Sequence, residues 1–582
     1  MSLLAVVTVS ALVLLAAYVI YGRVLGRLLE LDPNRRTPAY ELRDDLDYSP
    51  LEPSALLSQH FSAIAAAGPI VGPILAGVMF GWVPALCWIL VGSVFVGGVH
   101  DYFTLVASIR HKARSIAEVV RDHMSRRSYL LFLSFVWLAL VYIIVAFTDI
   151  TASSFIGSAK LENGQVVTGG GIATSSLLYL ALPVIMGLLM RYTKLRMGTA
   201  TVIFLPLVGV AIWLGQKIPF DVEGLLLSWN PTWSGPQAEV AALKTWDVAL
   251  LIYCFIASIV PVWILLQPRG HLGGYFLYAA LAAGAAGVIL GGKAVEFPAF
   301  RGWTTPKGQT LFPVLFITIA CGACSGFHSM IASGTTSKQL RRETDARIIG
   351  YGAMLLEAMV AVVALCCVMI LPPTSGITDE KANYIYAQGI GRFLEVIGIP
   401  GTVGVAFAMM AFTTFVYDTL DVCTRLGRFI IQELTGWHDA KGRWISTLLT
   451  AAVPVYFLMQ THVDPGTGKV IPVWETFWSL FGASNQLLAA LTLLGVTVWL
   501  WRTRGVRWVW FVTGIPTVFM YVMSTWALVQ IIGHDFGSLV ASIAMVLLAL
   551  AALMAVEAVV IFVRGGSPPR SEREPDVELA SA

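Results

Sequence analysis

Charged residues are scarce in this chain. Only 13% of its 582 residues are Asp, Glu, Lys or Arg, whereas 57% are hydrophobic. Many apolar runs exceed the roughly 18 residues that mark a membrane-spanning helix. The composition therefore excludes a water-soluble globular protein and predicts an all-α polytopic membrane protein.

Signature motifs of common enzymes are missing as well. The chain has no Walker A run, no HExxH pair and no GxSxG elbow. ATP-driven transport and intramembrane metalloprotease activity are therefore disfavoured. We expect a protein that is not an enzyme, needs no cofactor and draws any energy it uses from an ion gradient.

The sequence also offers little for disulfides, nucleic acids or export signals. Its seven cysteines all fall in or near apolar runs, so none is placed for an extracellular disulfide. The net charge of +3 gives no reason to expect a nucleic-acid partner. No Lys or Arg precedes Arg23 and no cleavage pattern follows, so we expect residues 1–22 to be a first span and not a signal peptide.

Fifteen apolar stretches are expected to span the membrane. The polar, proline-containing residues 565–582 are expected to form a disordered tail. The predicted spans cover residues 2–22, 60–79, 81–109, 129–153, 173–190, 198–215, 246–266, 272–292, 311–334, 348–371, 400–424, 444–460, 474–500, 508–531 and 537–563.

The positive charges predict how these spans are oriented. If the N-terminus lies outside, the cytoplasmic loops hold 29 of the 38 Lys and Arg residues and the outer loops hold 9. Cytoplasmic loops of membrane proteins are enriched in Lys and Arg. We therefore expect the N-terminus outside and the C-terminus inside, with multi-pass insertion in the cell membrane.

Two sets of five spans follow an extra N-terminal region, residues 1–59. The sets cover residues 60–215 and 246–424, and four additional spans follow in 444–563. Because five is odd, the second set is inverted relative to the first. The first span of each set is interrupted, by Gly68-Pro69 and Gly72-Pro73 in one and by Pro261 in the other. This pattern resembles the leucine-transporter-like fold, an inverted 5+5 repeat whose first helices are unwound at the substrate and ion sites.

An interrupted helix has a physical use inside a membrane. Unpaired backbone groups cannot face lipid, but they can face a polar site. The N-terminus of a half-helix attracts a carboxylate, and freed carbonyls attract a cation. The substrate-binding candidates are therefore Ala66, Ala67 and Gly68 at the first break and Pro261 at the second. The alternative is a pair of simple proline kinks.

Ionisable side chains within spans are costly and are candidates for function. His100 and Asp101 are adjacent, so on a regular helix they point to different faces; they either couple ions or cap nearby loops. Asp149 precedes Thr151, Ser153 and Ser154, whose hydroxyls are available to it. It is either a proton-coupling residue or a carboxylate at the outer interface.

The densest polar stretch of any span is residues 320–336. Cys321, Cys324 and His328 are spaced to share one helical face. Three interpretations remain open: a soft-metal site, which is the least favoured; close helix packing around small residues; and a substrate or proton site that uses Ser325 and His328. Histidine titrates near neutral pH, which suits proton coupling.

A further group of charges lies towards the inner end of span 400–424. Asp418 and Asp421 share a face, and Arg425 follows Asp421 by one turn. We expect a solvated Asp421–Arg425 ion pair, whereas Asp418 lies deeper and is a coupling candidate. Glu357 lies well within its own span and is expected to have a structural partner.

Six motifs in this order resemble the carbon starvation protein A (CstA) family, over most of the chain. They are HFSAIAAAGPIVGP, GGVHDYF, VPVWILLQPRG, ACGACSGFHSMIASGTT, DTLDVCTRLGRF and LFGASNQLLAAL.

This resemblance implies an inner-membrane carrier that takes up pyruvate with protons, or peptides, during starvation. Ser62, Ser258 and Ser325 would supply hydroxyls to a small carboxylate. His328 or Asp149 would carry the coupling proton, and Arg269 would act as a gate. A peptide or amino-acid transporter is the alternative, and sodium is the alternative coupling ion. A channel or a sensor is disfavoured, because no continuous polar pore and no soluble output domain are evident.

Overall fold

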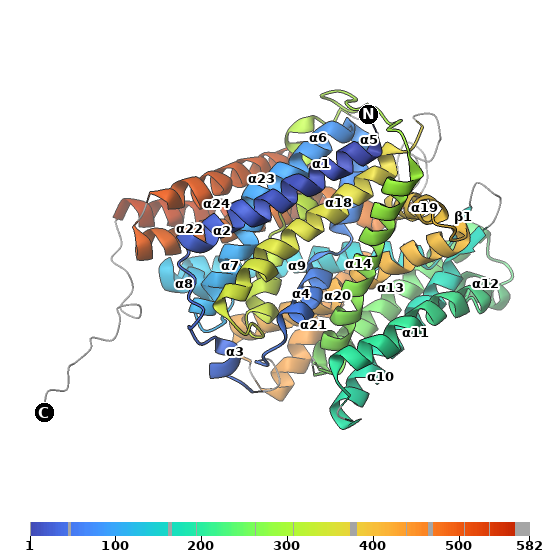
Figure 1. Ribbon diagram of the computed structural model, residues 1–582, viewed down its shortest axis with the longest axis horizontal. Coiled ribbons are helices and arrows are strands. Elements are labelled where there is room, and N and C mark those ends of the chain that lie inside the picture. The colour runs from blue at the N-terminus through green and yellow to red at the C-terminus, as the bar shows by residue number, and fades with distance from the viewer. Residues whose placement is uncertain are drawn as a thin grey trace, which may run out of the picture.

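The protein is almost entirely helical, as its apolar composition predicts. The computed structural model, shown in Figure 1, describes residues 2–44, 48–160, 166–193, 195–261, 263–306, 308–372, 381–437, 439–463, 470–505, 507–534 and 536–564. The predicted disordered tail, residues 565–582, lies outside the described residues.

The first half of the described chain runs from the N-terminal helix to the helix that follows Pro261. Segments η1 and η2 are π-helical. The elements are α1 (Leu3–Ala16), η1 (Ala17–Tyr21), α2 (Gly22–Leu28), α3 (Pro38–Glu41), α4 (Pro53–Ile64), α5 (Gly68–Phe80), α6 (Trp82–Gly92), η2 (Ser93–Gly97), α7 (Gly98–Arg110), α8 (Ile116–His123), α9 (Arg126–Ser154), α10 (Gly169–Thr193), α11 (Met197–Lys217), α12 (Val222–Trp229), α13 (Gly235–Ile259) and α14 (Leu266–Gly291).

The second half continues with short helices and then long spans. Segments η3, η5 and η7 are π-helical and η4 is a 3₁₀ turn. The elements are α15 (Leu311–Thr318), α16 (Ala320–Ala323), α17 (Phe327–Ile331), η3 (Ala332–Thr336), η4 (Glu343–Asp345), η5 (Arg347–Gly352), α18 (Ala353–Met369), α19 (Ala382–Glu395), α20 (Gly401–Thr435), α21 (Ala440–Leu458), α22 (Val473–Arg504), η7 (Trp510–Gly514), α23 (Ile515–His534) and α24 (Leu539–Arg564).

Strands are confined to two short antiparallel hairpins among the described residues. One pairs β1 (Ser158–Lys160) with β2 (Val166–Thr168), and Ser158 lies opposite Thr168. The other pairs β3 (His462–Val463) with β4 (Val470–Ile471). Each hairpin connects long helices and adds no layer to the helical core.

The described residues contain 12 helices long and apolar enough to cross a membrane, or 13 when the bent pair α4 and α5 counts as one span. Each of the fifteen predicted spans overlaps one or more helices, although the span 246–266 extends beyond the end of α13 at Ile259. The two that do not meet this length and hydropathy test are 311–334, which is divided among short helices, and 444–460, which forms the 19-residue α21. The orientation with the N-terminus outside stays a prediction.

Two interrupted helices run antiparallel through the middle of the molecule. Residues of the first lie beside residues of the second in reversed order: His60 with Thr336, Ile64 with His328, Gly68 with Cys321 and Gly72 with Thr318. The first is α4 and α5, bent by 46° at residues 65–67. The second is α15, α16 and α17. The breaks therefore meet at one level.

The second break lies elsewhere than predicted. Helix α13 ends at Ile259 and α14 begins at Leu266, so Pro261 lies in the connection between two separate spans and is exposed. The prediction of an interrupted span at Pro261 is therefore wrong. The backbone that faces the first break belongs to residues 319–326, where Ile319 and Cys324 leave helical geometry (φ −94°, ψ 49° and φ −164°, ψ 122°).

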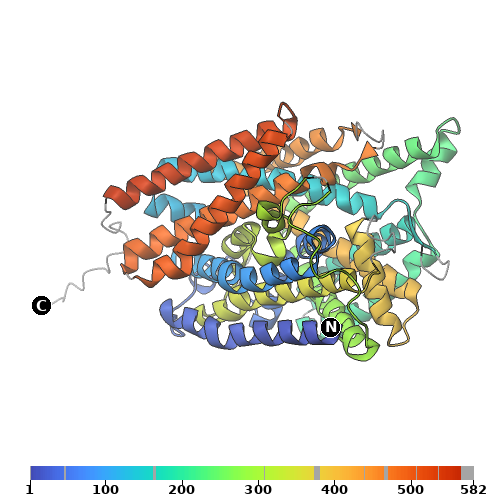
Figure 2. The ribbon, with the colours of Figure 1, turned by 90° about the horizontal axis from the view of Figure 1, so that it is seen from above.

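Long helices surround the two interrupted ones. Helices α9, α13, α20 and α21 pack against one another, and α18 packs along α5. The hairpin of α10 and α11 lies at one end of the long axis and α24 at the other (Figures 1 and 2). Helix α11 keeps many side chains exposed, as expected where a hairpin faces lipid. The division into repeats at 60–215 and 246–424 stays a prediction.

Candidate functional site

The first break leaves two backbone donors without partners among the described residues. Helix α4 ends at Ile64, and α5 begins at Gly68 with Pro69 in its first turn, where proline's missing N–H costs nothing. No hydrogen bond from the N–H of Ala67 or Gly68 occurs within the described chain, and no side chain caps α5. The predicted candidates Ala66, Ala67 and Gly68 thus form the open N-terminus of a half-helix.

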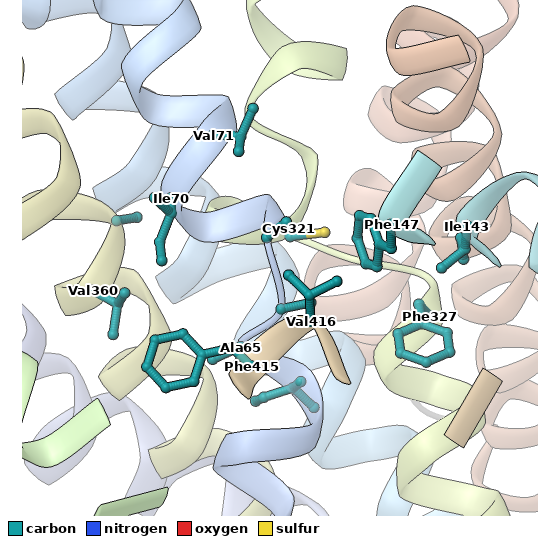
Figure 3. Close-up of a cluster of buried hydrophobic side chains, with 14 of the residues drawn as sticks. Ala65, Ile70, Val71, Ile143, Phe147, Cys321, Phe327, Val360, Phe415 and Val416 are labelled. Atoms are coloured by element: carbon teal, nitrogen blue, oxygen red, sulfur yellow. The ribbon is translucent and has the colours of Figure 1, made fainter. Parts of the chain in front are cut away.

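Apolar side chains enclose this break. Figure 3 shows Phe147 of α9, Phe415 and Val416 of α20, and Phe327 of α17 around Ala65 and Cys321. All six residues are buried. The donors of α5 therefore face a dry environment, in which a carboxylate would interact strongly with them.

The second break is already capped. The N–H of Phe327 donates to Oδ1 of Asn485 (3.0 Å) and the N–H of Gly326 donates to the Asn485 carbonyl (3.1 Å). The Asn485 amide also donates to Ser325 Oγ at 3.0 Å. Sequence reasoning missed Asn485, although an adjacent Asn-Gln pair inside an apolar span is a usable signal.

A chain of four titratable side chains lies beside both breaks. His328 of α17 is placed between two carboxyl groups, with Nδ1 2.8 Å from Asp101 Oδ2 and Nε2 3.3 Å from Glu357 Oε2. Asp101 Oδ1 is in turn 2.7 Å from Nδ1 of His100. All four residues are fully buried. We call this group the histidine–carboxylate chain.

The chain changes two expectations from the sequence. His100 and Asp101 were expected on different faces of α7, yet they are directly hydrogen-bonded. The expectation was wrong because Nδ1 lies near the backbone of its own residue, so the ring can reach the carboxylate of the next one. Glu357 has a partner, as expected, but the partner is His328 of the central broken helix.

His60 lies close to this chain on α4, the half-helix that precedes the first break. Its Nδ1 is 2.8 Å from Thr336 Oγ1, and Nε2 has no partner in the described chain. His60 also lines a pocket with Gln59, Gly270 and Asp418, whose free volume of about 10 Å³ is close to the lower limit for one water molecule.

A second buried cluster is centred on Arg269, in the first turn of α14. Nε of Arg269 is 2.8 Å from Asp418 Oδ1, and Nη1 pairs with Asp421. Tyr253 donates to Asp421 Oδ2 (2.8 Å), and Ser62 donates to Asp418. We call these five residues the arginine cluster. It joins α4, α13, α14 and α20.

The arginine cluster contradicts the predicted exposed pair of Asp421 and Arg425. Asp421 is 1% exposed and binds Arg269, whereas Arg425 donates to the carbonyl of Ala257 at 2.9 Å and to that of Val260. The prediction failed because helical spacing sees only the partner one turn away. The charge 152 positions earlier in the chain is closer in the fold.

Asp149 is fully buried. From the sequence, three nearby hydroxyl groups were expected to be available to it, but these groups bond elsewhere. Thr151, Ser153 and Ser154 donate to backbone carbonyls of their own helix. Asp149 instead accepts the N–H of Trp474 at 2.9 Å. It lies in neither of the two clusters.

The remaining predicted residues divide between the site and the periphery. Ser325 and Cys321 lie at the second break with Asn485. Ser258 is buried near the end of α13, where its carbonyl accepts Arg428 Nη1 at 2.5 Å. The structure therefore unites the residues of the breaks with His100, Asp101 and His328, and it unites Ser62 with Asp418 and Arg269. Within the described residues, no three His, Cys, Asp or Glu side chains are arranged to hold a metal.

Comparison with known protein families shows to which family this chain is related. The family model of carbon starvation protein CstA matches residues 2–378 and 373–527. The chain belongs to the CstA family. This confirms the resemblance carried by the six motifs.

Named relatives of this CstA-family protein are transporters. The peptide transporter CstA of Campylobacter jejuni is 32% identical, over 92% of this chain and 81% of the relative. The pyruvate/proton symporter BtsT of Escherichia coli K12 is 32% identical, over 90% and 81%. The peptide transporter CstA of the same organism is 30% identical, over 89% and 79%.

Solved structures with a similar course of the chain are more distant. A manganese transporter of Eremococcus coleocola aligns over 89% of this chain and 99% of its own, with 14% identity and a TM-score of 0.43. MhsT in complex with L-phenylalanine aligns over 85% and 98%, with 14% identity and a TM-score of 0.34.

Proposed function

We propose that this protein is a secondary transporter of the cell inner membrane that takes up pyruvate, or a similar small monocarboxylate, together with protons during carbon starvation. The observation that carries the proposal is the histidine–carboxylate chain beside both helix breaks. It brings groups that exchange protons next to backbone donors that suit an anion. The names of the relatives, a pyruvate/proton symporter and peptide transporters, support the same activity.

The substrate carboxylate would bind at the N-terminus of α5. The N–H groups of Ala67 and Gly68 have no partner in the described chain, and the helix dipole adds positive potential there. Phe147 and Phe415 lie around the break and suit a methyl group. Ser325 would add a hydroxyl from the opposite broken helix, where Asn485 orients it.

Proton coupling would be electrostatic. Protonation of His328 places a positive charge beside Ile64, immediately before the open N-terminus of α5. That charge attracts the substrate carboxylate, and a bound carboxylate favours the protonated imidazole in return. The proton and the monocarboxylate would therefore bind together, which is the requirement for symport.

The arginine cluster would serve as the inner gate. Ser62 connects the inner half-helix α4 to Asp418, and Arg269 connects Asp418 to Asp421. Movement of α4 away from α20 must break the Ser62 contact. Alternating access needs such a contact, one that holds in one state and is released in another.

A peptide or amino-acid substrate is the second candidate, because several relatives carry that name. An ammonium group would need a carboxylate near the breaks. Asp418 is bound to Arg269 and Ser62, and Asp101 is shared by two histidines. These occupied carboxylates favour the monocarboxylate.

Reconstituted transport tests the proposal. Purified protein in liposomes is given labelled pyruvate or labelled dialanine, with and without an imposed pH gradient. We expect an inward proton gradient to drive accumulation of pyruvate. Pyruvate entry that ignores the gradient would refute proton symport, entry driven by a sodium gradient would reassign the ion, and entry of dialanine alone would establish the second candidate.

Two histidine variants sharpen this test. His328→Gln should abolish gradient-driven accumulation, because the amide cannot carry the proton. His534→Gln changes an exposed histidine at the end of α23 and should leave accumulation intact. If the His328 variant still accumulates pyruvate, His328 does not carry the coupling proton and its role is purely structural.

A further inference from the structure

An apolar groove opens on the surface between α1 and α4. Helix α18 forms its floor and lies beside α1, with α4 on its other side (Figure 1). The groove holds about 320 Å³ of free space, and its lining among the described residues includes no charged side chain. Both α1 and α18 belong to helices long and apolar enough to cross a membrane, so the groove faces lipid. Its walls include Ala11, Leu15 and Leu57, and its floor includes Leu355, Leu356 and Met359.

The groove is about as long as one leaflet of a bilayer. Tyr18 lies at one end beside Gly352, where a Cβ atom would be 3.3 Å from the Tyr18 ring. Because α1 and α18 run in opposite directions, Ala11 and Met359 lie at the other end. The floor from Ile348 to Met359 measures about 16 Å at a rise of about 1.5 Å per residue. The hydrocarbon core of a bilayer is about 30 Å thick, so one leaflet contributes roughly 15 Å.

A cation lies at one end of the groove. The guanidinium of Arg347 lies over the Tyr18 ring, 5.2 Å from its centroid, and the next residue, Ile348, lines the groove. Such stacking holds a guanidinium in place without neutralising its charge. Arg110 pairs with Glu343, whereas Arg347 forms no ion pair with the described residues. The Arg347 donors are therefore available to an anion at the end of the groove.

The apolar lining, the length and the terminal cation fit one kind of ligand. A phospholipid has apolar chains of leaflet length and a phosphate at the interface, and basic sites between spanning helices bind anionic head groups. We propose that the groove binds an anionic phospholipid, with one acyl chain between α1 and α4 and the phosphate on Arg347. An inorganic anion would leave the groove empty, and an apolar helix of a second copy would leave Arg347 without a counter-ion.

This lipid site goes beyond the proposed function, and only its effect on transport rests on that function. The bound chain would contact Leu57 of α4, the half-helix that precedes the first break. It would also contact Leu356, the neighbour of Glu357 on α18. A chain in the groove would fill the space between α4 and α1. The lipid would thereby restrain the half-helix that carries Ser62 of the arginine cluster.

Native mass spectrometry tests the lipid site without any substrate. Purified full-length protein is stripped of lipid and titrated with dipalmitoyl phosphatidylglycerol, or with dipalmitoyl phosphatidylethanolamine, which has no net charge. We expect phosphatidylglycerol to bind more tightly. Arg347→Gln should weaken its binding about fivefold, since one interfacial arginine is lost, and should remove the preference between the two lipids. Ala11→Trp, which fills the groove from α1, should weaken the binding of both lipids.

The matched control is Arg191→Gln. Arg191 also stacks on an aromatic ring, that of Trp263, but it belongs to α10 and does not border the groove. Its loss should leave the binding of both lipids unchanged. An equal weakening in the Arg191 and Arg347 variants would overturn the proposal, because the attraction would then come from general surface charge. So would unchanged phosphatidylglycerol binding in either the Arg347 or the Ala11 variant. A lipid-free dimer that Ala11→Trp dissociates would also overturn it, because the groove would then be an interface between copies.

The two proposals fail separately. Lipid binding is measured without transport, so a protein that prefers phosphatidylglycerol at this groove but does not accumulate pyruvate would remove the proposed function alone. Proton-driven accumulation in a protein without the lipid preference would remove only the lipid site. The melting temperature of each lipid-free variant shows whether it is folded, and Arg347→Gln should leave that temperature nearly unchanged because Arg347 pairs with no acid among the described residues.

Discussion

Gly68 of α5 and Cys321 of α16 are in direct contact where the two broken helices cross. A Cβ atom on Gly68 would overlap both Cβ and Sγ of Cys321. The crossing therefore depends on the absence of a side chain at position 68. It also keeps the open N-terminus of α5 close to the second break.

Replacing Gly68 by Ala should separate the broken helices. The added methyl group has no space, so we expect a loss of about 1–3 kcal/mol in the free energy of unfolding and a marked loss of pyruvate uptake. Adding Cys321→Gly removes both overlapping atoms and should recover much of the stability. Gly198→Ala is the matched control, because nothing lies within 4 Å of a Cβ there. Thermal unfolding and uptake are measured for all four proteins.

Asn485→Ala should weaken the second break. It removes the acceptor for the N–H of Phe327 and the donor to Ser325, and unsatisfied buried groups cost about 1–3 kcal/mol. We expect a lower melting temperature and a higher KM for pyruvate. Asn34→Ala removes an exposed asparagine side chain and should change neither. An unchanged KM in the Asn485 variant would argue against a substrate contact through Ser325.

Arg269→Gln should destabilise the protein more than the other substitutions. It leaves Asp418 and Asp421 buried without their cation, which costs about 3–5 kcal/mol. Adding Asp421→Asn removes one of these charges and should restore part of the stability. Arg191→Gln, at an exposed arginine that stacks on Trp263, should have little effect. If the double variant loses as much stability as the two single variants together, Arg269 and Asp421 do not stabilise each other.

Glu357→Gln should separate coupling from binding. The amide keeps the shape of the side chain but cannot exchange a proton with His328, which is 3.3 Å away. We expect gradient-driven accumulation of pyruvate to fall to the level without a gradient. Exchange of labelled for unlabelled pyruvate should continue, because it needs no net proton movement.

The control for this variant is Glu239→Gln, at an exposed position near the start of α13. It should leave both activities unchanged. If the Glu357 variant loses exchange as well as accumulation, the carboxyl group contributes to substrate binding and not to coupling alone.

The spans and the first break were predictable because they depend on local sequence. Apolar runs marked the helices, and Gly68 with Pro69 marked the place where α4 ends and α5 begins. The second break was misplaced at Pro261 because a single sequence does not show what satisfies a broken backbone. The backbone of the second break is satisfied by Asn485, which follows Phe327 by about 160 positions in the chain.

The candidate residues were predictable one by one, but their partnerships were not. His328 and Asp101 were each singled out as ionisable groups inside spans, yet 227 positions separate them in the sequence. Arg269 was expected to act as a gate, but its partners Asp418 and Asp421 lie on another helix. Such pairs follow from how the helices cross, which periodicity and composition do not specify.

The backbone donors of the two breaks differ in whether they have a partner, and this difference affects substrate selectivity. Asn485 occupies the donors at the start of α17, whereas those at the start of α5 have no partner within the described chain. The proposed site thus offers backbone donors to one carboxylate only. A dicarboxylate such as oxaloacetate would bring a second anion against the rings of Phe147 and Phe415, which themselves donate no hydrogen bond. Discrimination between three-carbon and four-carbon keto acids would then arise from a side-chain amide that never touches the substrate.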